Sequence, residues 1–307
     1  MQKIIVIIGP TAVGKTALSL ALGQQLNGEI VSVDSMQVYR HLDIGTAKAT
    51  PEEQALVPHH MLDLVEPDQP YSVAQFIERA QGEIAAIGQR GHTPIIVGGT
   101  GFYIQALLGD RPLAKIEEQP DPDFEATWDA RVQNEGEAPL RQALAQLDPI
   151  SAERILPGQI RRLKRALLVS QQTGQPFSDL QPEPKRIYDA YIIGLNTERS
   201  VLYDRINKRV DDMLEAGLLD EARLVQQLPD SATAKKAIGY KELFGYLDGT
   251  MSLEAAKDAL KQASRRYAKR QLTWFNNQMH DVDWVDLVQN PDTLNDLTGK
   301  MQEFMSE

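Results

Sequence analysis

Ile4-Ile5-Val6-Ile7-Ile8 is an uninterrupted apolar run, and Gly9-Pro10-Thr11-Ala12-Val13-Gly14-Lys15-Thr16 follows it at once, ahead of an Ala/Leu-rich segment. The pattern predicts a buried strand, a phosphate-binding loop and a helix. The two glycines allow tight turns, so that backbone N–H groups and the positive end of the helix point at an anion. Lys15 adds a mobile positive charge, and the Thr16 hydroxyl is suited to hold Mg²⁺. The loop is of the nucleotide-binding (ATP-binding) type, but it does not say which molecule carries the phosphate.

Two further apolar stretches, 29–33 and 93–97, predict buried strands, and residues 71–90 between them predict a helix. Strands that alternate with helices are typical of a parallel, doubly wound sheet, whose ligands bind beyond the carboxyl ends of the strands. We therefore expect an α/β fold of the P-loop NTPase-like kind, a parallel sheet flanked by helices. The phosphate loop and the turns at 34–37 and 98–101 all follow strands, and we expect them to converge on one pocket.

The texture of the sequence changes near residue 113, where it becomes charged, helical and broken by prolines, until the apolar strand 188–195 resumes the core pattern. We expect residues 114–186 to form a small all-α domain inserted into an α/β core made of residues 1–113 and 187–307. Long helices are predicted near 197–216, 218–228 and 252–277. The sequence after about residue 286 is uninformative.

Composition limits the kinds of protein this chain can be. It has 307 residues, a net charge of -11, no cysteine and five histidines. Disulfides, thiolate nucleophiles and thiolate metal sites are excluded, and the histidines lack zinc-ligand spacing, so we expect a hard, oxygen-liganded metal. No stretch approaches the ~20 apolar residues that span a bilayer, and the start of the chain leads into the phosphate loop without a cleavable signal. A cytoplasmic monomer without membrane contact is expected.

Asp34 stands at the end of the second strand, where two interpretations compete. A carboxylate there cannot help to bind a phosphate, but it can accept a proton from a nucleophile aimed at the substrate that carries the phosphate. It can equally be a turn cap, a role that Asp favours. The third strand ends in glycines rather than in the acidic residue usual in nucleotide hydrolases, and Asp63 is the nearest substitute. This argues against a motor ATPase and leaves a small-molecule kinase or another phosphate-handling transferase open.

Two basic segments stand out in this acidic chain. Arg161-Arg162-Leu163-Lys164-Arg165 lies in the expected insertion, and its three arginines share one face of a helix. Such a face suits contacts with the phosphates of a nucleic acid, although most charges of this kind are simply solvated. The second segment, 261–270, reads KQASRRYAKR. Both segments concentrate positive charge locally. A local basic surface matters more for RNA binding than the net charge of the whole chain.

A helical wheel of residues 253–274 divides the second basic segment. The apolar stripe that we expect in the core consists of Leu253, Ala256, Leu260, Ala263, Tyr267 and Trp274. The opposite face carries Lys261, Arg265, Arg266 and Lys269. Arg270 borders the stripe, so among these cations it is the best placed to turn inward.

Taken together, these segments resemble the tRNA dimethylallyltransferase (tRNA isopentenyltransferase) family over nearly the whole chain. The matching motifs occur in the family's order: GPTAVGKT at 9–16, DSMQVYR at 34–40, PHHMLDL at 58–64, GGTGFY at 98–103, RRLKRAL at 161–167, RVDDMLEAGLLDEA at 209–222, AIGYKEL at 237–243 and YAKRQLTWF at 267–275. The resemblance implies transfer of a dimethylallyl group from dimethylallyl diphosphate to the exocyclic amine of the adenosine immediately 3′ of the anticodon in tRNA, giving isopentenyladenosine and diphosphate.

The resemblance also assigns roles to residues. It implies that Asp34 is the base that holds and deprotonates the adenine amine, and that Lys15, Thr16 with Mg²⁺ and the loop amides stabilise the departing diphosphate. Arg205, Arg209 and Arg270 are unranked candidates for the diphosphate or the RNA. The expected tRNA contacts are Asp34, Ser35, Met36, Gln37, Thr100, Arg161, Arg162, Leu163, Lys164, Arg165, Lys236, Ala237, Ile238, Gly239, Tyr240 and Lys241.

The insertion departs from the family pattern at two places. The family usually has Asn-Asp shortly before its paired arginines and Glu after Arg-Ala-Leu, whereas this chain has Gly158-Gln159 and Leu168. Three other functions compete with the one implied. An adenylate isopentenyltransferase that acts on free AMP, ADP or ATP would keep the loop and the aspartate without the arginine face. A P-loop kinase for a small molecule would consume ATP, and a pure RNA-binding module would leave the phosphate loop unexplained.

Overall fold

The computed structural model describes residues 1–114, 119 and 121–306. The chain divides into two compact units, one formed by residues 1–110 with 186–307 and the other by residues 111–185. Residues 115–118 and 120 of the expected insertion, and residue 307 of the expected core, lie outside the described residues. Within the described part of the chain, no helix combines the length and the apolar character that crossing a membrane requires.

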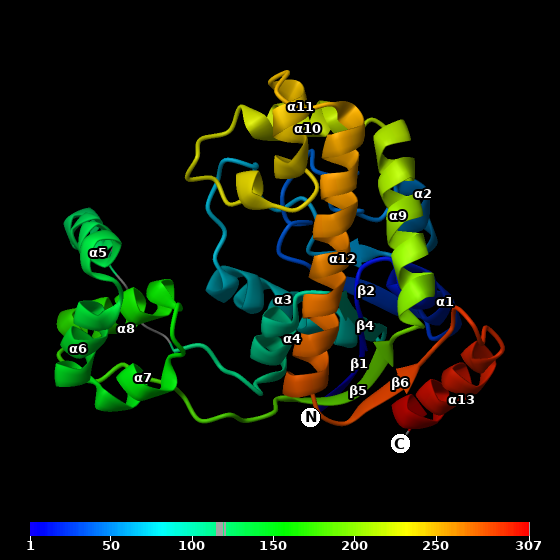
Figure 1. Cartoon of the computed structure of the whole chain (residues 1–307). Helices are drawn as coiled ribbons and strands as arrows, with labels where there is room; N and C mark the ends of the chain where they lie inside the picture. Colours follow the sequence, from blue (N-terminus) through cyan, green and yellow to red (C-terminus); the bar gives the residue numbers. More distant parts are fainter. Residues whose placement is uncertain (115–118, 120, 307) are drawn as a thin grey trace. The chain divides into compact units, whose positions relative to one another are not determined.

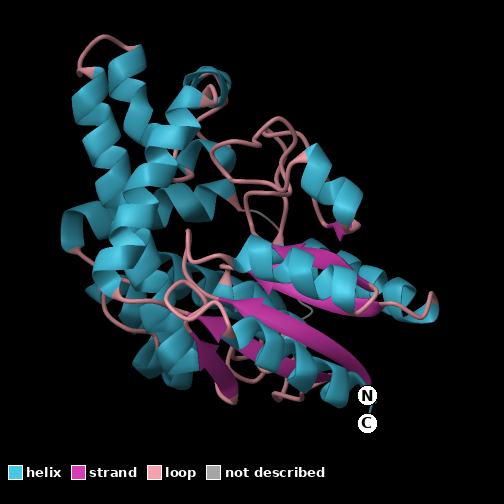
Figure 2. Ribbon diagram, turned by 90° about the vertical axis from the view of Figure 1, so that its right-hand side faces the viewer, coloured by secondary structure: helices cyan, strands magenta, loops and turns pink. Residues whose placement is uncertain are grey.

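A six-stranded parallel sheet forms the centre of the first unit (Figures 1 and 2). Its strand order is β3-β2-β4-β1-β5-β6. The strands are β1 (Gln2–Ile8), β2 (Gly28–Val33), β3 (His59–His60), β4 (Thr93–Gly98), β5 (Tyr188–Leu195) and β6 (Val282–Val285). The four strands expected from the sequence are confirmed, whereas the short edge strands β3 and β6 were not expected.

Helices flank this sheet, as the alternating pattern predicts. They are α1 (Lys15–Gln25), α2 (Pro51–Leu56), α3 (Val73–Gln89), α4 (Gly101–Leu108), α9 (Arg199–Glu215), α10 (Leu218–Gln226), α11 (Phe244–Leu247), α12 (Leu253–Gln278) and α13 (Thr293–Ser306). Two 3₁₀ turns, Ala234–Lys236 and Lys241–Leu243, lie between α10 and α11. Helix α13 folds from the tail that the sequence left uninterpreted.

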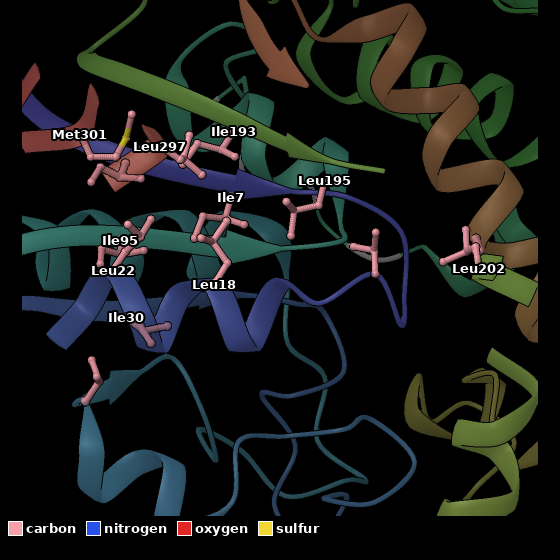
Figure 3. Close-up of a cluster of buried hydrophobic side chains, with 14 of the residues drawn as sticks. Ile7, Leu18, Leu22, Ile30, Ile95, Ile193, Leu195, Leu202, Leu297 and Met301 are labelled. Atoms are coloured by element: carbon pink, nitrogen blue, oxygen red, sulfur yellow. The ribbon is translucent and has the colours of Figure 1, made fainter. Parts of the chain in front are cut away.

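Burial explains why the first strand is apolar without alternation. Ile4 to Ile8 are all 0% exposed, because a central parallel strand is covered on both faces. Ile7 packs with Leu18 and Leu22 of α1, Ile95 of β4 and Ile193 of β5 (Figure 3). Each such side chain contributes roughly 1.5–3 kcal/mol when it is fully buried. This core fixes β1, and with it the phosphate loop that follows.

The core stripe expected on α12 is only partly right. Ala256 and Leu260 are buried, while the remaining members of the expected stripe are half-buried. Ala268, Gln271 and Phe275 complete the buried face instead. Two of the charges expected to be solvated contact α9: Lys261 pairs with Asp211, and Arg265 donates to Asn207. The long helix therefore packs through α9-facing cations as well as through its apolar stripe.

Among its described residues, the second unit contains helices and loops but no strand. Its helices are α5 (Pro122–Glu135), α6 (Ala138–Leu147), α7 (Pro149–Arg154) and α8 (Ile160–Thr173). Leu140, Leu144, Leu163 and Leu167 form its small core together with Ala152 and Ala166. Aspartate caps begin two of the helices: Asp121 accepts from the Phe124 N–H and Asp148 from the Ser151 N–H, each at 2.9 Å.

Candidate active site

The phosphate loop follows β1 and has the backbone conformation that its glycines allow. Gly9 and Gly14 have φ values of 148° and 110°, in the region that favours glycine. A Cβ on Gly9 would also lie 2.6 Å from the Leu195 carbonyl oxygen, so the loop packs against β5. Lys15 folds back over the loop, where its Nζ donates to the carbonyls of Gly9 at 2.9 Å and Pro10 at 2.8 Å. The amino group of Lys15 is thus held against the backbone of the loop.

Asp34 lies at the carboxyl end of β2, two strands away from β1 with β4 between them. Its Oδ1 accepts from the Met36 N–H at 2.8 Å, which is the turn-capping bond of the second interpretation. Its charge nevertheless acts on Lys15 of the phosphate loop and on Arg209 of α9. The capping interpretation is therefore confirmed, and the capping bond orients a carboxylate that belongs to the charged cluster of the loop. The interpretation of Asp34 as a base stays a prediction. We call Lys15, Asp34 and Arg209 the site cluster.

Burial moves all three groups of the site cluster toward their neutral forms. It lowers the pKa of Lys15 from 10.5 to about 7, with a further contribution from the positive charge of Arg209. It raises the pKa of Asp34 above 3.8, against hydrogen bonds from the backbone and the charge of Lys15. It also lowers the pKa of Arg209. Groups with such shifts are typical of functional sites, because a charge left without full compensation is ready for a ligand.

The structure separates the three arginines that the sequence left unranked. Arg205 donates from Nε to the Ala12 carbonyl at 2.8 Å, so it contacts the phosphate loop directly. Arg209, one helical turn further on α9, belongs to the site cluster. Arg270 is exposed and lies over the ring of Tyr267, 5.7 Å from its centroid, so the expectation that it turns inward is wrong. The cation–π contact with an adjacent turn of its own helix holds it at the surface.

The turn after β4 lies between the other two turns of the site. Thr100 Oγ1 accepts from the N–H of Ser35 at 3.4 Å, which joins this turn to the residue after Asp34. On the other side, Gln271 of α12 bonds to both Gly99 and Thr11. The convergence expected for the three turns is thus confirmed. Gln271 itself was not expected, although it falls on the buried stripe of α12, where a polar residue demands a partner.

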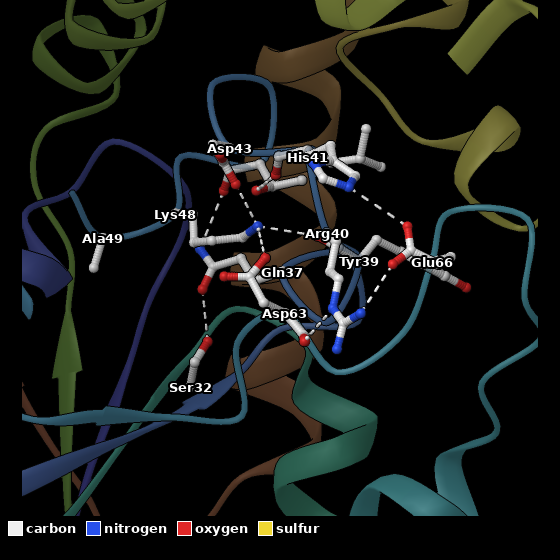
Figure 4. A network of polar contacts seen from close by, with 12 residues as sticks. Ser32, Gln37, Tyr39, Arg40, His41, Asp43, Lys48, Ala49, Asp63 and Glu66 are labelled. Atoms are coloured by element: carbon white, nitrogen blue, oxygen red, sulfur yellow. Dashed lines mark hydrogen bonds and ion pairs between the residues drawn. The ribbon is translucent and has the colours of Figure 1, made fainter. Parts of the chain in front are cut away.

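The segment after Asp34 is fixed by buried polar contacts, shown in Figure 4. Gln37, expected among the RNA contacts, is half-buried; it accepts from Ser32 Oγ at 2.6 Å and donates to the carbonyls of Thr46 and Ala47. Lys48, whose side chain is 3% exposed, pairs with Asp43 and Asp63. Asp63 therefore serves a structural ion pair, rather than the role of the acidic residue that follows a strand in nucleotide hydrolases.

Glu221 of α10 fastens the same segment from outside. Its carboxylate accepts from the N–H groups of Asp43 at 2.8 Å, Ile44 at 2.7 Å and Gly45 at 2.9 Å, and from the hydroxyl of Tyr240 at 3.0 Å. A Cβ on Gly45 would lie 2.5 Å from the Tyr240 ring, so the two chain segments touch directly. This contact joins the motif that contains Glu221 to the motif that contains Tyr240.

Tyr240 also corrects part of the RNA-contact expectation for residues 236–241. Its side chain is 0% exposed, and Ala237 and Gly239 are buried as well, so these three face the interior. Lys236 and Lys241 are exposed, and Ile238 is half-buried. The two lysines therefore remain the side chains of this segment that a ligand can reach.

In the second unit, the arginine face of α8 forms as the wheel predicts. Arg161, Arg162 and Arg165 are exposed, opposite the buried Leu163. Leu163 and Lys164 were expected to contact RNA, and this expectation is wrong for their side chains, because both are buried. Lys164 pairs with Glu125 and Asp129 of α5. A lysine at this position faces inward because it shares the i, i+3, i+4 stripe of Ile160, Leu163 and Leu167.

The two departures from the family pattern have local explanations. Gly158 has a φ of 80°, which suits glycine in the turn that precedes α8. Gln159 is the residue before α8, and its Oε1 accepts from Arg162 at 2.9 Å. Leu168 is 5% exposed, so an apolar residue suits this position.

The residues available to bind a magnesium ion fit a site that the substrate helps to form, rather than one made by protein side chains alone. Among the described residues, no group of three or more His, Asp or Glu side chains is placed to hold a metal. Thr16 is exposed on the first turn of α1, beside the loop amides. Mg²⁺ commonly takes one or two protein oxygens and completes its shell with substrate phosphates and water, so the Thr16 hydroxyl fits this use.

A parallel α/β sheet with a glycine-rich phosphate loop after its central strand, and a cluster of one carboxylate and two cations beside that loop, defines a P-loop protein that handles a phosphorylated substrate. The model of the IPP transferase family matches residues 37–278, and that of the isopentenyl transferase family matches residues 2–62. The chain belongs to the tRNA dimethylallyltransferase family, and the resemblance drawn from its motifs is confirmed.

Individual relatives match this chain over nearly its full length. The tRNA dimethylallyltransferase of Latilactobacillus sakei subsp. sakei is 53% identical over 291 residues, which are 94% of this chain and 93% of that one. The crystal structure of the full-length tRNA isopentenylpyrophosphate transferase of Bacillus halodurans has a TM-score of 0.72 and 44% identity, covering 99% of this chain and 96% of that one. A eukaryotic dimethylallyltransferase acting on tRNA has a TM-score of 0.86 at 29% identity, with 100% and 80% covered.

Proposed function

We propose that this protein transfers the dimethylallyl group of dimethylallyl diphosphate to the exocyclic amine of the adenosine immediately 3′ of the anticodon in tRNA, giving isopentenyladenosine and diphosphate. The observation that carries the proposal is the site cluster, in which a carboxylate of raised pKa lies beside two cations at a phosphate loop. Membership in the tRNA dimethylallyltransferase family supports the substrate pair.

The reaction forms a bond between the amine nitrogen and C1 of the dimethylallyl group and breaks the bond between C1 and the diphosphate oxygen. The electron pair of the broken bond leaves with the diphosphate, whose charge Lys15, Arg209 and the loop amides stabilise. The proton of the amine passes to Asp34. Because burial raises the pKa of Asp34, its carboxylate is a stronger base than an exposed aspartate. A positioned base typically contributes ~10²–10⁴-fold in rate.

A magnesium ion bound through Thr16 and the diphosphate would add positive charge on the leaving group. The residues of this chain have the other tasks. Arg205 bonds to the Ala12 carbonyl and so supports the loop on its α9 side. Gln37 and Lys48 hold the segment after Asp34 in place before substrate arrives. A site arranged in advance is what a reaction with large charge movement requires.

The tRNA supplies the acceptor adenine, which must leave its stack to reach Asp34. Unstacking costs a few kcal/mol and is cheapest in a single-stranded loop, so an anticodon loop suits the site. We assign the grip on the anticodon stem-loop to the helical insertion, through the exposed Arg161, Arg162 and Arg165, and to Lys236 and Lys241 of the core. Ser35, Met36 and Thr100 would line the slot of the target nucleotide. We assign the enzyme to the cytoplasm and expect it to act as a monomer.

A competition assay tests the proposed function. The protein is given Mg²⁺, labelled dimethylallyl diphosphate, free AMP and an anticodon stem-loop with adenosine 3′ of the anticodon. We expect label on that adenosine, and none on a control stem-loop with guanosine at the same position. Label on AMP would replace the proposal by an adenylate isopentenyltransferase, and phosphorylated product with consumption of added ATP would indicate a kinase.

A further inference from the structure

Gln271 is a buried polar residue in the middle of α12, and its side chain is bonded at both ends. Its Oε1 accepts from the Thr11 N–H of the phosphate loop at 3.0 Å, and its Nε2 donates to the Gly99 carbonyl at 3.0 Å. The residue is 6% exposed. One amide of the phosphate loop is therefore bound to a side chain from a helix about 260 residues away in sequence, rather than pointing at the ligand.

The side-chain amide of Gln271 lies close against Gly99. A Cβ added to Gly99 would lie 2.3 Å from Gln271 Nε2, and one added to Gly101 would lie 2.1 Å from the ring of Trp274. Neither glycine has a positive φ, so close approach to α12 is what requires a glycine at both positions. The turn after β4 is thus packed against the same helix that holds the phosphate loop.

The acceptor side of the site is joined to this turn. Thr100 follows Gly99 and accepts from the N–H of Ser35, the residue after Asp34. A continuous path of hydrogen bonds and covalent links therefore runs from Thr11 through Gln271, Gly99 and Thr100 to Asp34. The path connects the loop that would hold the diphosphate to the carboxylate that would take the proton.

We infer that Gln271 is a positioning residue, which sets the distance and orientation of the phosphate loop relative to the turns that hold the acceptor adenine and Asp34. The inference rests on the proposed function in taking the ligand of the loop to be a diphosphate. Alkyl transfer needs the nitrogen, C1 and the leaving oxygen in line, and misplacement by about 1 Å can cost on the order of 10²-fold in rate. Gln271 touches neither substrate, so it acts through the two backbone groups that it holds.

The chain offers a matched control for this inference. Gln105 of α4 is 8% exposed, and its Nε2 donates to the Gln278 carbonyl at the end of α12. It is therefore another buried glutamine whose side chain bonds to a backbone carbonyl of α12. Unlike Gln271, it lies outside the three turns of the site. A loss of packing and of a hydrogen bond should affect both glutamines, whereas loss of alignment should affect Gln271 alone.

The first test compares Gln271→Leu with Gln105→Leu in single-turnover transfer to the stem-loop. We expect Gln271→Leu to lower the rate on the order of 10²-fold, while stem-loop affinity stays within about twofold. Gln105→Leu should keep the rate within about threefold. Its decrease in Tm should be the smaller one, because it loses one hydrogen bond and removes a buried oxygen, Oε1, that has no hydrogen-bond partner among the described residues. Equal rates in the two variants would overturn the inference.

The second test uses Gln271→Glu and inorganic pyrophosphate, and it does not depend on prenyl transfer. The introduced carboxylate keeps an acceptor for Thr11 but cannot donate to Gly99, and it brings negative charge to the phosphate loop. We expect pyrophosphate to bind at least about tenfold more weakly than to wild type at pH 8, and this ratio to shrink at pH 6, where protonation restores a donor. A ratio near one at both pH values would overturn the inference.

These outcomes remain distinct from failure of the proposed function. If the wild-type protein does not label the stem-loop but pyrophosphate binding follows the expected ratios, the proposed reaction is wrong and the positioning role stands. If the wild type labels the stem-loop, but Gln271→Leu has the same rate as Gln105→Leu and Gln271→Glu binds pyrophosphate as the wild type does, the positioning role alone is wrong. If Gln271→Leu does not fold, the binding ratios of Gln271→Glu decide.

Discussion

The site cluster and a second cluster of charges around Glu29 lie at opposite ends of β2, and they differ in how fully the charge of the carboxylate is compensated. Glu29, near the start of the strand, is 3% exposed and accepts from Arg90 at 3.0 and 2.6 Å, from His60 at 2.5 Å and from His92 at 2.5 Å. These partners, with the Arg90 hydrogen bonds first, lower its pKa to about 2. We call this group the Glu29 cluster.

Asp34, just beyond the other end of the strand, receives too little compensation for its burial, and its pKa rises. The strand thus has a carboxylate near its start that stabilises the fold in its charged form, and a carboxylate just beyond its end whose charged form is disfavoured by burial. The contrast teaches where to look for function. A buried charge that is fully paired belongs to the fold, whereas a buried charge that is underpaired is kept for a ligand or a proton.

The largest effect expected from this contrast is on the rate of Asp34→Asn. The amide keeps an oxygen for the Met36 N–H but cannot take a proton, so the single-turnover rate should fall ~10²–10⁴-fold. Stem-loop affinity should change little. In the wild type, the rate should fall as the pH is lowered through the raised pKa of Asp34, because the protonated carboxyl is no base. A variant that keeps the wild-type rate would reduce Asp34 to a turn cap and break the contrast.

For Asp34→Asn we also predict a change in folding stability, opposite in sign to the change predicted below for Glu29→Gln. Because the folded-state pKa of Asp34 is raised above 3.8, ionising it at neutral pH costs stability that a neutral amide does not cost. Asp34→Asn should therefore be at least as resistant to urea as the wild type at pH 7. Marked destabilisation would show that the carboxylate of Asp34 is needed by the fold.

Glu29→Gln should show the second largest effect, in stability rather than in rate. The pKa of Glu29 is lowered from 4.5 to about 2, so its contribution is present above pH 4.5 and is lost as the pH falls from 4.5 to about 2. A difference of this size corresponds to about 3 kcal/mol. Urea unfolding at pH 7 should show that loss, and the gap from the wild type should close near pH 2. Transfer by the folded variant should stay within about threefold of the wild-type rate.

The exposed arginines of the second unit represent a third kind of charge, which lies on the surface of α8 rather than in the core or in the site cluster. Changing Arg161 and Arg165 together to alanine should raise the KM for the stem-loop roughly tenfold and lower the slope of log affinity against log salt by about 1 to 2, since each phosphate contact contributes ~0.7–0.9. Arg131→Ala is the control, because Arg131 is an arginine of the same unit that pairs with Glu135. An unchanged salt slope in the double variant would remove the arginine face from the RNA contacts.

Much of the fold could be predicted from the sequence, because the pattern of a long periodic or apolar segment is enough to indicate its secondary structure. The strands β1, β2, β4 and β5 and the helices α9, α10 and α12 are of this kind. Strand β3 has only two residues and β6 four, of mixed polarity, so each acquires its conformation from the strand beside it. Propensity over so few residues is too weak to predict a strand.

The residues of the site also differ in how far the sequence could predict them. Lys15 belongs to a motif whose spacing indicates its chemistry, whereas the role of Asp34 as a base was implied only by the family resemblance. Gln271, Glu221 and Glu29 have partners that are distant in sequence, so their roles exist only after folding. Pattern did offer a partial signal for Gln271 and for Lys164, since both interrupt an apolar stripe of a helix. It could reveal that they are buried, but not what they bind.

The smallest effect expected is a proton uptake that distinguishes Lys15 from an ordinary exposed lysine. With a pKa of about 7, Lys15 is largely neutral at pH 8, and a bound diphosphate should favour its protonated form. Calorimetric titration with pyrophosphate at pH 8, in buffers of different ionisation enthalpy, should therefore reveal uptake of up to about one proton beyond that of Lys15→Arg, whose side chain stays charged. The excess should vanish at pH 6, where Lys15 already carries its proton. Equal uptake by the two proteins at pH 8 would mean that Lys15 is charged before the ligand arrives, and that the site cluster is paired as completely as the Glu29 cluster.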